Sequence, residues 1–247
     1  MNLIEKGSQT AKNGFRNEND IVSKFNNWKS DTDAQHWLQQ MKYNLKEIES
    51  VSAIKLAGYK TDVQVQVTIK LKQAIDVENL QVKLVSQSKG FNQIDKRWVE
   101  KYAQMWNIPH EINSILKRYT GEDKPNIKNP RDKRRMYADE FSPKEQTLIL
   151  NWLNQNKTMI VCDIMKGRGR FAAEWLLVAQ KVAKNARWIL KPMNFCLNYY
   201  SKGTVFITPK GNFRIGKITM QRKGGDNGRD TAKMLQFKID PTELFNN

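Results

Sequence analysis

Histidine and cysteine are scarce in this sequence, and their scarcity excludes several kinds of chemistry. The 247 residues include two histidines, His36 and His110, and two cysteines, Cys162 and Cys196. A serine hydrolase needs a histidine base, and neither histidine has a companion at the spacing of a metal site. The zinc patterns Cys-x-x-Cys and His-Glu-x-x-His do not occur. The two cysteines lie in apolar surroundings, which indicates buried free thiols in a reducing compartment.

Long apolar runs and nucleotide-binding loops are also missing. No run approaches the roughly 18 apolar residues that cross a membrane. Residues 1–6 show no charged start followed by an apolar stretch, so no signal peptide is evident. The glycine turn at Lys166–Arg170 has neither the Walker nor the dinucleotide spacing. We therefore expect a cytoplasmic protein that has no membrane partner and binds no nucleotide at this turn.

Acidic residues are too few to balance the basic ones. There are 42 Lys and Arg against 25 Asp and Glu, for a net charge of +17. Residues 157–238 hold 17 basic and 4 acidic residues, so this third of the chain carries +13 of the total. This balance favours a nucleic acid as partner, ahead of a solubilising basic surface or a membrane surface. Seven Trp, ten Phe and seven Tyr supply material for the core of one substantial domain.

One stretch combines an acid, an amide and a lysine on two neighbouring strands. Residues 63–69 and 80–85 each alternate apolar and polar side chains with period two, which predicts strands with one buried face. Asp62 shares a face with the polar residues of the first strand. Gln81 and Lys83 share one face of the second strand. If the two strands pair, the three side chains meet at one place.

The chemistry that remains for these residues is that of a divalent metal bound by oxygen atoms. Mg²⁺ prefers carboxylate, amide and carbonyl oxygens. Hydrolysis of a phosphodiester needs a metal that activates water, a rigid set of ligands and a nearby cation. We expect Asp62, Gln81 and the carbonyl of Val82 to hold the metal, and Lys83 to supply the cation.

The remaining periodicity predicts helices and strands on both sides of this hairpin. Helices are expected at 9–29, 33–48, 98–119 with a break at Pro109, 139–155 and 170–184. Strands are expected at 158–164, 188–190, 204–208, 212–222 and 234–239. A polar connection at 72–79 joins the two paired strands. Residues 120–135 form a linker-like stretch whose basic end either touches phosphates or is a solvated loop.

Two loops, 87–97 and 221–229, combine cations, amides and glycines as DNA-contacting segments do. Glycine lets the backbone approach a ligand closely, and arginine can contact a guanine edge through two hydrogen bonds. Each loop also fits an ordinary solvated turn. The candidate DNA-binding residues are Phe91, Gln93, Lys96, Arg97, Gln221, Arg222, Lys223 and Arg229. Within this set, Gln93, Lys96, Arg222 and Lys223 are candidate base readers, and Phe91 is a candidate wedge between bases.

The paired strands resemble the signature of the PD-(D/E)XK nucleases. Asp62, 18 intervening residues and Gln81-Val82-Lys83 follow its spacing. Thr61 stands in place of the proline of the signature, and Gln81 stands in place of its second acid. A neutral Gln81 lowers the negative charge at the metal, so the number of metal ions stays open.

An upstream helix extends this resemblance. Type II restriction endonucleases of the PD-(D/E)XK fold often have such a helix, with a glutamate that faces the metal. The stretch Gly14-Phe15-Arg16-Asn17-Glu18 is similar to it. The resemblance implies that Glu18 assists the catalytic residues, although Glu18 also fits a solvated position on a surface helix.

Beyond the signature, the whole chain resembles the type II restriction endonucleases, and it closely resembles the GCGC-cleaving group from Haemophilus. It is also similar to the monomeric CCGG-cutting group. The resemblance implies an α/β (α+β) fold with a mixed central sheet flanked by helices. It further implies Mg²⁺-dependent cleavage of double-stranded DNA at a short GC-only palindrome, leaving 5′ phosphates. We expect one domain over 1–247, with helices and the catalytic hairpin in 1–100 and a basic, β-rich, DNA-contacting part in 157–240.

Two other functions stay open at this stage. One is a non-catalytic, sequence-specific DNA-binding protein in which Asp62 and Lys83 merely pair on the surface. The other is a repair or structure-selective nuclease of the same fold. Whether a monomer or a homodimer acts on the DNA is also open.

Overall fold

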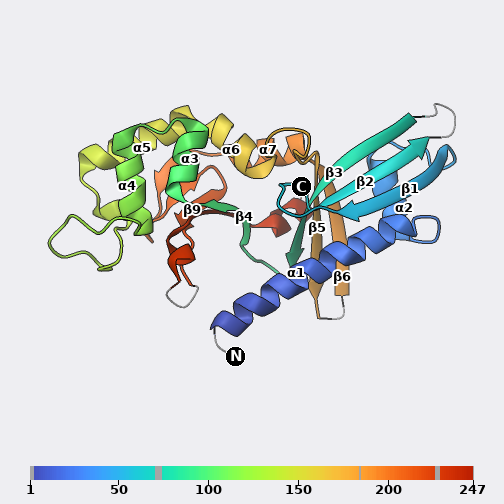
Figure 1. Cartoon of the computed structure of the whole chain (residues 1–247), viewed down its shortest axis with the longest axis horizontal. Coiled ribbons are helices and arrows are strands. Elements are labelled where there is room, and N and C mark those ends of the chain that lie inside the picture. Colours follow the sequence, from blue (N-terminus) through green and yellow to red (C-terminus); the bar gives the residue numbers. More distant parts are fainter. Residues whose placement is uncertain (1–2, 70–73, 184, 226–228, 247) are drawn as a thin grey trace. The chain divides into compact units, whose positions relative to one another are not determined.

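The computed structural model describes residues 3–69, 74–183, 185–225 and 229–246. The chain forms two compact units (Figure 1). We call Ser8–Asn92, Met165–Cys196 and Asp240–Asn247 the hairpin unit, because it contains the strands that carry Asp62 and Lys83. We call Met1–Gly7, Gln93–Ile164 and Leu197–Ile239 the helix-rich unit.

The hairpin unit is built on a mixed sheet of five strands, as the resemblance implied. Its strand order is β1-β2-β3-β5-β6, and β3 and β5 are the only neighbours in it that run parallel. The strands are β1 (Ile48–Lys55), β2 (Val63–Ile69), β3 (Ala74–Val85), β5 (Trp175–Val182) and β6 (Asn185–Pro192). The predicted pairing of β2 with β3 is confirmed and is antiparallel.

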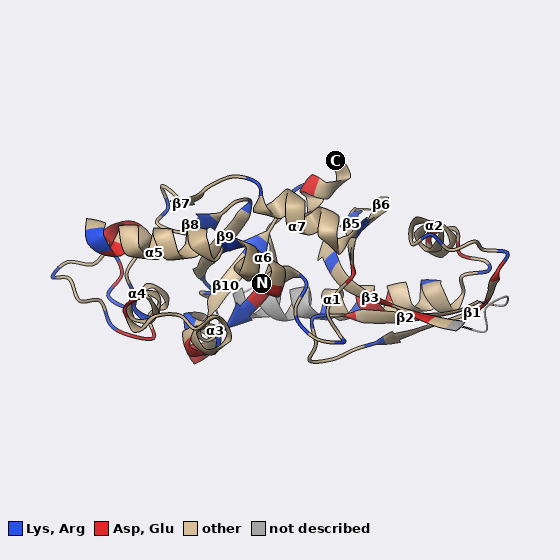
Figure 2. Ribbon diagram, turned by 90° about the horizontal axis from the view of Figure 1, so that it is seen from above, with Lys and Arg blue, Asp and Glu red and all other residues tan. Residues whose placement is uncertain are grey.

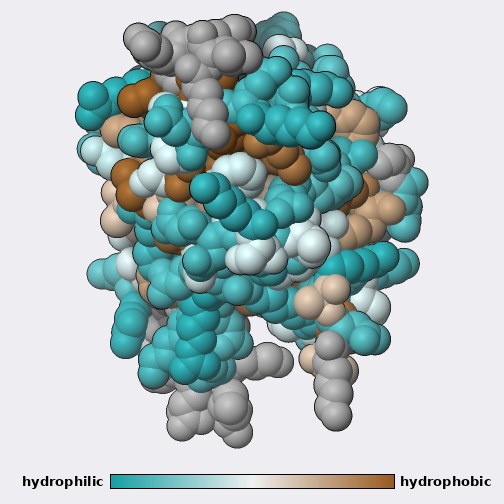
Figure 3. Space-filling model, turned by 90° about the vertical axis from the view of Figure 1, so that its right-hand side faces the viewer, coloured by the Kyte–Doolittle hydropathy of each residue, from teal (hydrophilic) through white to brown (hydrophobic). Residues whose placement is uncertain are grey.

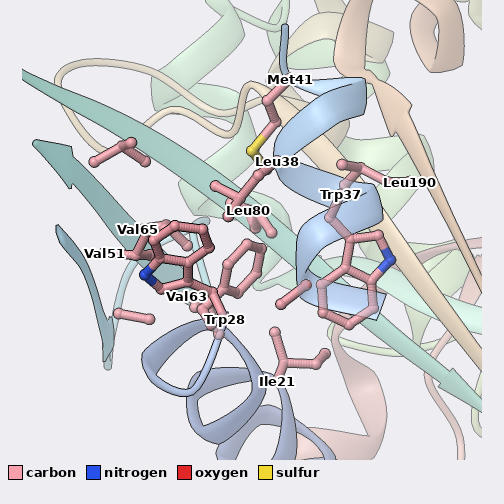
Figure 4. Close-up of a cluster of buried hydrophobic side chains, with 14 of the residues drawn as sticks. Ile21, Trp28, Trp37, Leu38, Met41, Val51, Val63, Val65, Leu80 and Leu190 are labelled. Carbon is pink, nitrogen blue, oxygen red and sulfur yellow. The ribbon is translucent and has the colours of Figure 1, made fainter. Parts of the chain in front are cut away.

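Two helices cover the apolar face of this sheet (Figure 4). They are α1 (Leu3–Asn26) and α2 (Thr32–Gln40). The apolar positions of β2 are fully buried, as its alternation predicts, and they pack with Ile21, Phe25 and Trp37 of the helices. Burial of such side chains contributes about 1.5–3 kcal/mol each. This packing fixes α1 against the strands that carry the candidate metal ligands.

Two boundaries in the hairpin unit differ from the prediction. The helix predicted at 33–48 ends at Gln40, because Lys42 adopts a left-handed backbone (φ 75°). Ile48 is instead the first residue of β1, where its side chain joins the same core. The connection predicted at 72–79 is shorter, since β3 begins at Ala74; residues 70–73 lie outside the described part of the chain.

The helix-rich unit has a second sheet of five strands in the order β4-β10-β9-β8-β7. The strands are β4 (Asn92–Arg97), β7 (Val205–Ile207), β8 (Phe213–Ile215), β9 (Ile218–Arg222) and β10 (Leu235–Ile239). The helices are α3 (Val99–Trp106), α4 (His110–Thr120), α5 (Pro143–Gln155) and α6 (Lys157–Met165), with a further helix, α7 (Met193–Ser201), crossing from the hairpin unit. Lys and Arg, blue in Figure 2, occur on β8 and β9. The break predicted at Pro109 is confirmed, since α3 ends at Trp106 and Pro109 is the N-cap residue of α4, and Ser142 caps α5.

Two elements have the opposite secondary structure from the prediction. Residues 158–164, predicted as a strand, belong to α6, and residues 170–184, predicted as a helix, contain β5. A short apolar run does not distinguish a buried strand from a buried helix. Strand β5 lies inside the sheet beside a parallel neighbour, so its run from Leu176 to Ala179 is buried on both faces and lacks alternation.

The predicted single strand at 212–222 is a tight hairpin of β8 and β9. Gly216 turns the chain with φ 56°, and a Cβ there would lie 2.7 Å from backbone oxygens of Tyr200 and Ser201.

The surface shown in Figure 3 is mainly hydrophilic, with apolar areas scattered between polar side chains. In the described part of the chain, no helix has the length and apolar character needed to cross a membrane.

Candidate active site

The pairing of β2 with β3 places Asp62 beside the strand that carries Gln81. Val63 faces Leu80 in the register, so Asp62 stands at the end of β2 opposite Gln81. The backbone N–H of Asp62 donates to the carbonyl of Leu80 at 2.9 Å, and the N–H of Val82 donates to Asp62 Oδ2 at 2.7 Å. Backbone hydrogen bonds therefore hold one carboxylate oxygen in place.

Gln81 is buried without a partner for its side-chain oxygen. The residue is 2% exposed, and Oε1 accepts no hydrogen bond from any described residue. A buried acceptor with no partner is costly and rare in folded proteins. An oxygen next to a fixed carboxylate is a suitable ligand for a divalent cation such as Mg²⁺.

Glu18 of α1 joins this site through electrostatics. Its carboxylate pairs with Lys55 at the end of β1, with Nζ 3.4 Å from Oε2. Burial raises the pKa of Glu18, the Asp62 carboxylate raises it further, and Lys55 and Lys83 act in the opposite direction. Two carboxylates and two ammonium groups therefore influence one another here.

No group of three or more His, Cys, Asp or Glu side chains is arranged as a metal site in the described residues. The donors available are two carboxylates, Glu18 and Asp62, with the Gln81 amide and backbone oxygens such as that of Val82. This donor set fits Mg²⁺, which is bound through few carboxylates and completes its shell with water and phosphate oxygens. It does not fit zinc, which prefers Cys and His.

One residue of the site, and one that directly precedes Glu18 in α1, were missed from the sequence. Lys55 faces Val63 in the β1–β2 register and so lies next to Asp62, but β1 itself was not predicted. Asn17 is 2% exposed, and neither atom of its amide has a hydrogen-bond partner among the described residues. It lines a groove of about 460 Å³ together with Arg16 and Lys181. The signal for Asn17 was its place beside Glu18 in the stretch 14–18.

In the helix-rich unit, the second sheet brings two predicted DNA-binding residues together. Gln221 of β9 pairs in register with Gln236 of β10, and Gln236 Nε2 donates to Gln93 Oε1 at 2.8 Å. Gln236 was not among the predicted site residues, and it is 5% exposed. Because its oxygen is engaged, Gln93 has its amide N–H groups left to offer a ligand.

The other predicted DNA-binding residues differ in their surroundings. Phe91 is 59% exposed, in the hairpin unit. Arg97, Lys96 and Arg229 are all exposed, and Arg97 forms an ion pair with Asp95, with Nε 3.3 Å from Oδ2. Lys223 donates its backbone N–H to the carbonyl of Met234 at 2.8 Å, where the chain leaves β9.

Arg222 ends β9 in a strongly basic setting. Burial lowers the pKa of its guanidinium, and Arg135 and Arg134 lower it further. The Nε atom is buried and has no hydrogen-bond partner among the described residues. The structure therefore brings Arg222 together with two cations that were not among the candidates.

An acid fixed against a Gln-x-Lys strand in a mixed sheet, with helices on the sheet, is the architecture of a restriction endonuclease. The crystal structure of restriction endonuclease MspI in complex with its cognate DNA superposes with a TM-score of 0.65. The match covers 96% of this chain and 93% of MspI at 16% sequence identity, and it shows the fold.

The family is shown by the sequence itself. The model of the R.HinP1I restriction endonuclease family matches residues 41–245, so the chain belongs to this family and is a type II site-specific nuclease. A search of curated proteins finds no match. The matched range contains Asp62, Gln81 and Lys83, whereas Glu18 and Asn17 precede it.

Proposed function

We propose that the chain cleaves both strands of DNA at a short GC-only palindrome, in a Mg²⁺-dependent reaction that leaves 5′ phosphates. The choice of GCGC, and the kinship with enzymes that cut CCGG, rest on the resemblance noted above. The observation that carries the metal chemistry is the buried, unpartnered oxygen of Gln81 beside the hydrogen-bonded carboxylate of Asp62.

Each residue of the site has a role in this proposal. Asp62, Gln81 and the carbonyl of Val82 hold Mg²⁺, and Glu18 assists from α1. The metal, when bound, supplies a Lewis acid that activates water and neutralises charge on the phosphate. Lys83 orients the attacking water and stabilises the negative charge that develops on the phosphorus oxygens.

Sequence recognition is assigned to the segments 87–97 and 221–229. The prediction that both are loops was wrong in part, because residues 92–97 form β4 and β9 extends to Arg222. Gln93, Lys96, Arg222 and Lys223 are the proposed base readers, and the exposed Phe91 is the proposed wedge. The remaining candidates, Arg97, Gln221 and Arg229, support the contact with DNA.

Cys162 and Cys196 form no disulfide. Reduced cysteines suit the cytoplasm, where we expect the enzyme to act.

Digestion of a plasmid of known sequence tests the proposal. With Mg²⁺ the purified protein should produce discrete fragments whose ends map to one GC-only palindrome, and the ends should ligate without added phosphate. The Asp62→Ala variant serves as the inactive control. Intact plasmid, nicks without a common sequence, or ends that lack a 5′ phosphate would each contradict it.

A further inference from the structure

The helix-rich unit contains a basic cavity of about 590 Å³ that the sequence did not reveal. Its walls come from residues 121–137 and from the connection between β9 and β10. Seven of its fourteen lining residues are Lys or Arg, and two are Asp or Glu. A concave surface with this charge concentrates polyanions.

One acid of the cavity is paired with Arg134, a cation of the same cavity, and the other accepts hydrogen bonds from groups that do not line it. Asp132 accepts hydrogen bonds from Arg134 Nε and Nη2, both at 2.9 Å, and the pKa of Asp132 is lowered, chiefly by these bonds. Glu122 accepts from the backbone N–H of Val99 at 3.0 Å and from the hydroxyl of Thr120. Among the described residues, neither carboxylate forms a hydrogen bond or an ion pair with the side chain of Arg135 or Arg222, and Asp132 acts on both only through longer-range electrostatics. A bound anion would be the natural further counter-charge.

The guanidinium groups of the cavity are crowded. Arg222 is half-buried with an unpartnered Nε, and its pKa is lowered by burial and then by Arg135 and Arg134. Like charges held together in a partly desolvated place repel one another. An anion placed among them relieves this repulsion and receives the hydrogen bonds that are left over.

Local contacts orient the side chains and backbone of the cavity wall formed by residues 121–137. Arg135 stacks on the ring of Tyr137 with its guanidinium carbon 3.9 Å from the ring centroid, and Met136 N–H donates to the carbonyl of Arg118 at 2.8 Å. Gly121 ends α4 with φ 86°, and a Cβ there would lie 2.4 Å from the carbonyl oxygen of Arg134. Because the guanidinium of Arg135 is already oriented by this stacking, its side chain loses little conformational entropy when it binds a phosphate.

We propose that Arg134 and Arg135 hold a backbone phosphate of the DNA at this cavity and thereby place the neighbouring base edge in front of Arg222. This rests on the proposed function, since it requires that the chain binds DNA at a specific site. Phosphate contacts set the position of a protein on DNA, and base contacts read the sequence. The sequence analysis left two interpretations for the basic end of residues 120–135, a phosphate contact or a solvated loop. Under this proposal the segment contacts phosphate and positions the DNA for Arg222.

Substitutions on and off the wall test this division. Arg134→Gln and Arg135→Gln each remove one charge at the cavity, and Lys128→Gln removes one at an exposed position of the same segment that does not line it. The dissociation constant is measured without metal, as a function of KCl concentration, on DNA with and without the recognition site. Each wall variant should lower the slope of log K against log [KCl] by about 0.9.

Both wall variants should also weaken binding to the two DNAs by the same factor, while Lys128→Gln leaves binding unchanged. Arg222→Gln should instead reduce the preference for the DNA with the recognition site, measured as the ratio of the two dissociation constants. Arg135→Lys retains the charge and should retain the slope. Thermal unfolding confirms that each variant is folded.

Two results would overturn the inference. One is that Arg134→Gln and Arg135→Gln show the same salt slope as Lys128→Gln. The other is that these two wall variants lose the preference for DNA with the recognition site while their salt slope stays unchanged. If the wild-type chain shows no preferred site, the proposed function fails. The comparison of slopes on non-specific DNA still decides whether the wall binds phosphate.

Discussion

The replacement Gln81→Glu gives the site its missing second acid and tests whether Gln81 faces the metal. Side chains directly opposite each other on antiparallel strands have Cβ atoms about 5 Å apart. Asp62 and Gln81 each adjoin the Val63–Leu80 pair at the end of the β2–β3 register, so continuing that register places them opposite each other. At about 5 Å and an effective permittivity of about 20, two carboxylates repel by about 3 kcal/mol. Without metal this repulsion destabilises the fold of the variant.

With Mg²⁺ bound, the effect of Gln81→Glu on stability reverses, because the added carboxylate attracts the cation. The concentration of Mg²⁺ that half-activates cleavage should therefore fall at least tenfold. The difference in Tm with and without Mg²⁺ should exceed that of the wild-type chain by several degrees, at about 2–4 °C per kcal/mol for a chain of this size. Both quantities are measured at neutral pH, by initial cleavage rates and by thermal unfolding.

The matched control is Gln66→Glu, which adds the same charge farther along β2, opposite Val77 of β3. It should change neither the metal dependence nor the effect of Mg²⁺ on Tm. The reasoning is refuted if Gln81→Glu folds, shows the wild-type Tm without metal and needs as much Mg²⁺ as before. In that case the unpartnered oxygen of Gln81 does not point to the metal.

Three further predictions concern the same site. Asp62→Ala and Lys83→Ala should abolish cleavage while electrophoretic mobility shifts still detect DNA binding, and cleavage by either variant would remove it from the catalytic assignment. The raised pKa of Glu18 means that the folded chain holds this proton more tightly, so stability falls as pH rises from about 4.5 through that pKa. Glu18→Gln should remove this loss and, at neutral pH, should need more Mg²⁺; unchanged unfolding and cleavage profiles from pH 4 to 8 would contradict this. Asn17→Leu removes a buried, unpaired amide and should stabilise the chain by about 1 kcal/mol in urea unfolding. A fall in cleavage rate of that more stable variant shows that Asn17 serves function, and an unchanged rate shows that it does not.

The fold could be predicted in part from local patterns. The alternation of residues 63–69 predicted β2, because one face of that strand is buried and the other is not. The same reasoning failed for β5, since both faces of that strand are covered. It also failed for α6, where Ile160, Val161 and Ile164 form an apolar run too short to show a helical period.

The candidate site divides in a similar way. Asp62, Gln81 and Lys83 were found because two adjacent strands joined by a short connection carry them. Lys55 was missed because it reaches Asp62 only through the β1–β2 register. Gln236 acquired its importance from a hydrogen bond to Gln93, which is 143 residues away in the chain.

The sequence by itself determined the chemistry of this protein: one acid, one amide and one lysine at a fixed spacing, a strongly basic composition, and too little histidine or cysteine for other mechanisms. Tertiary structure alone decided which unpredicted groups join them. Lys55 reaches Asp62 through the β1–β2 register, and Asn17 is held beside the hairpin unit's sheet by the packing of α1. Arg134 and Arg135 are held beside Arg222 by the folding of residues 121–137 onto β9. The physical reason is that alternation and spacing are properties of a short covalent segment, whereas such meetings depend on strand register and core packing between segments far apart in the chain.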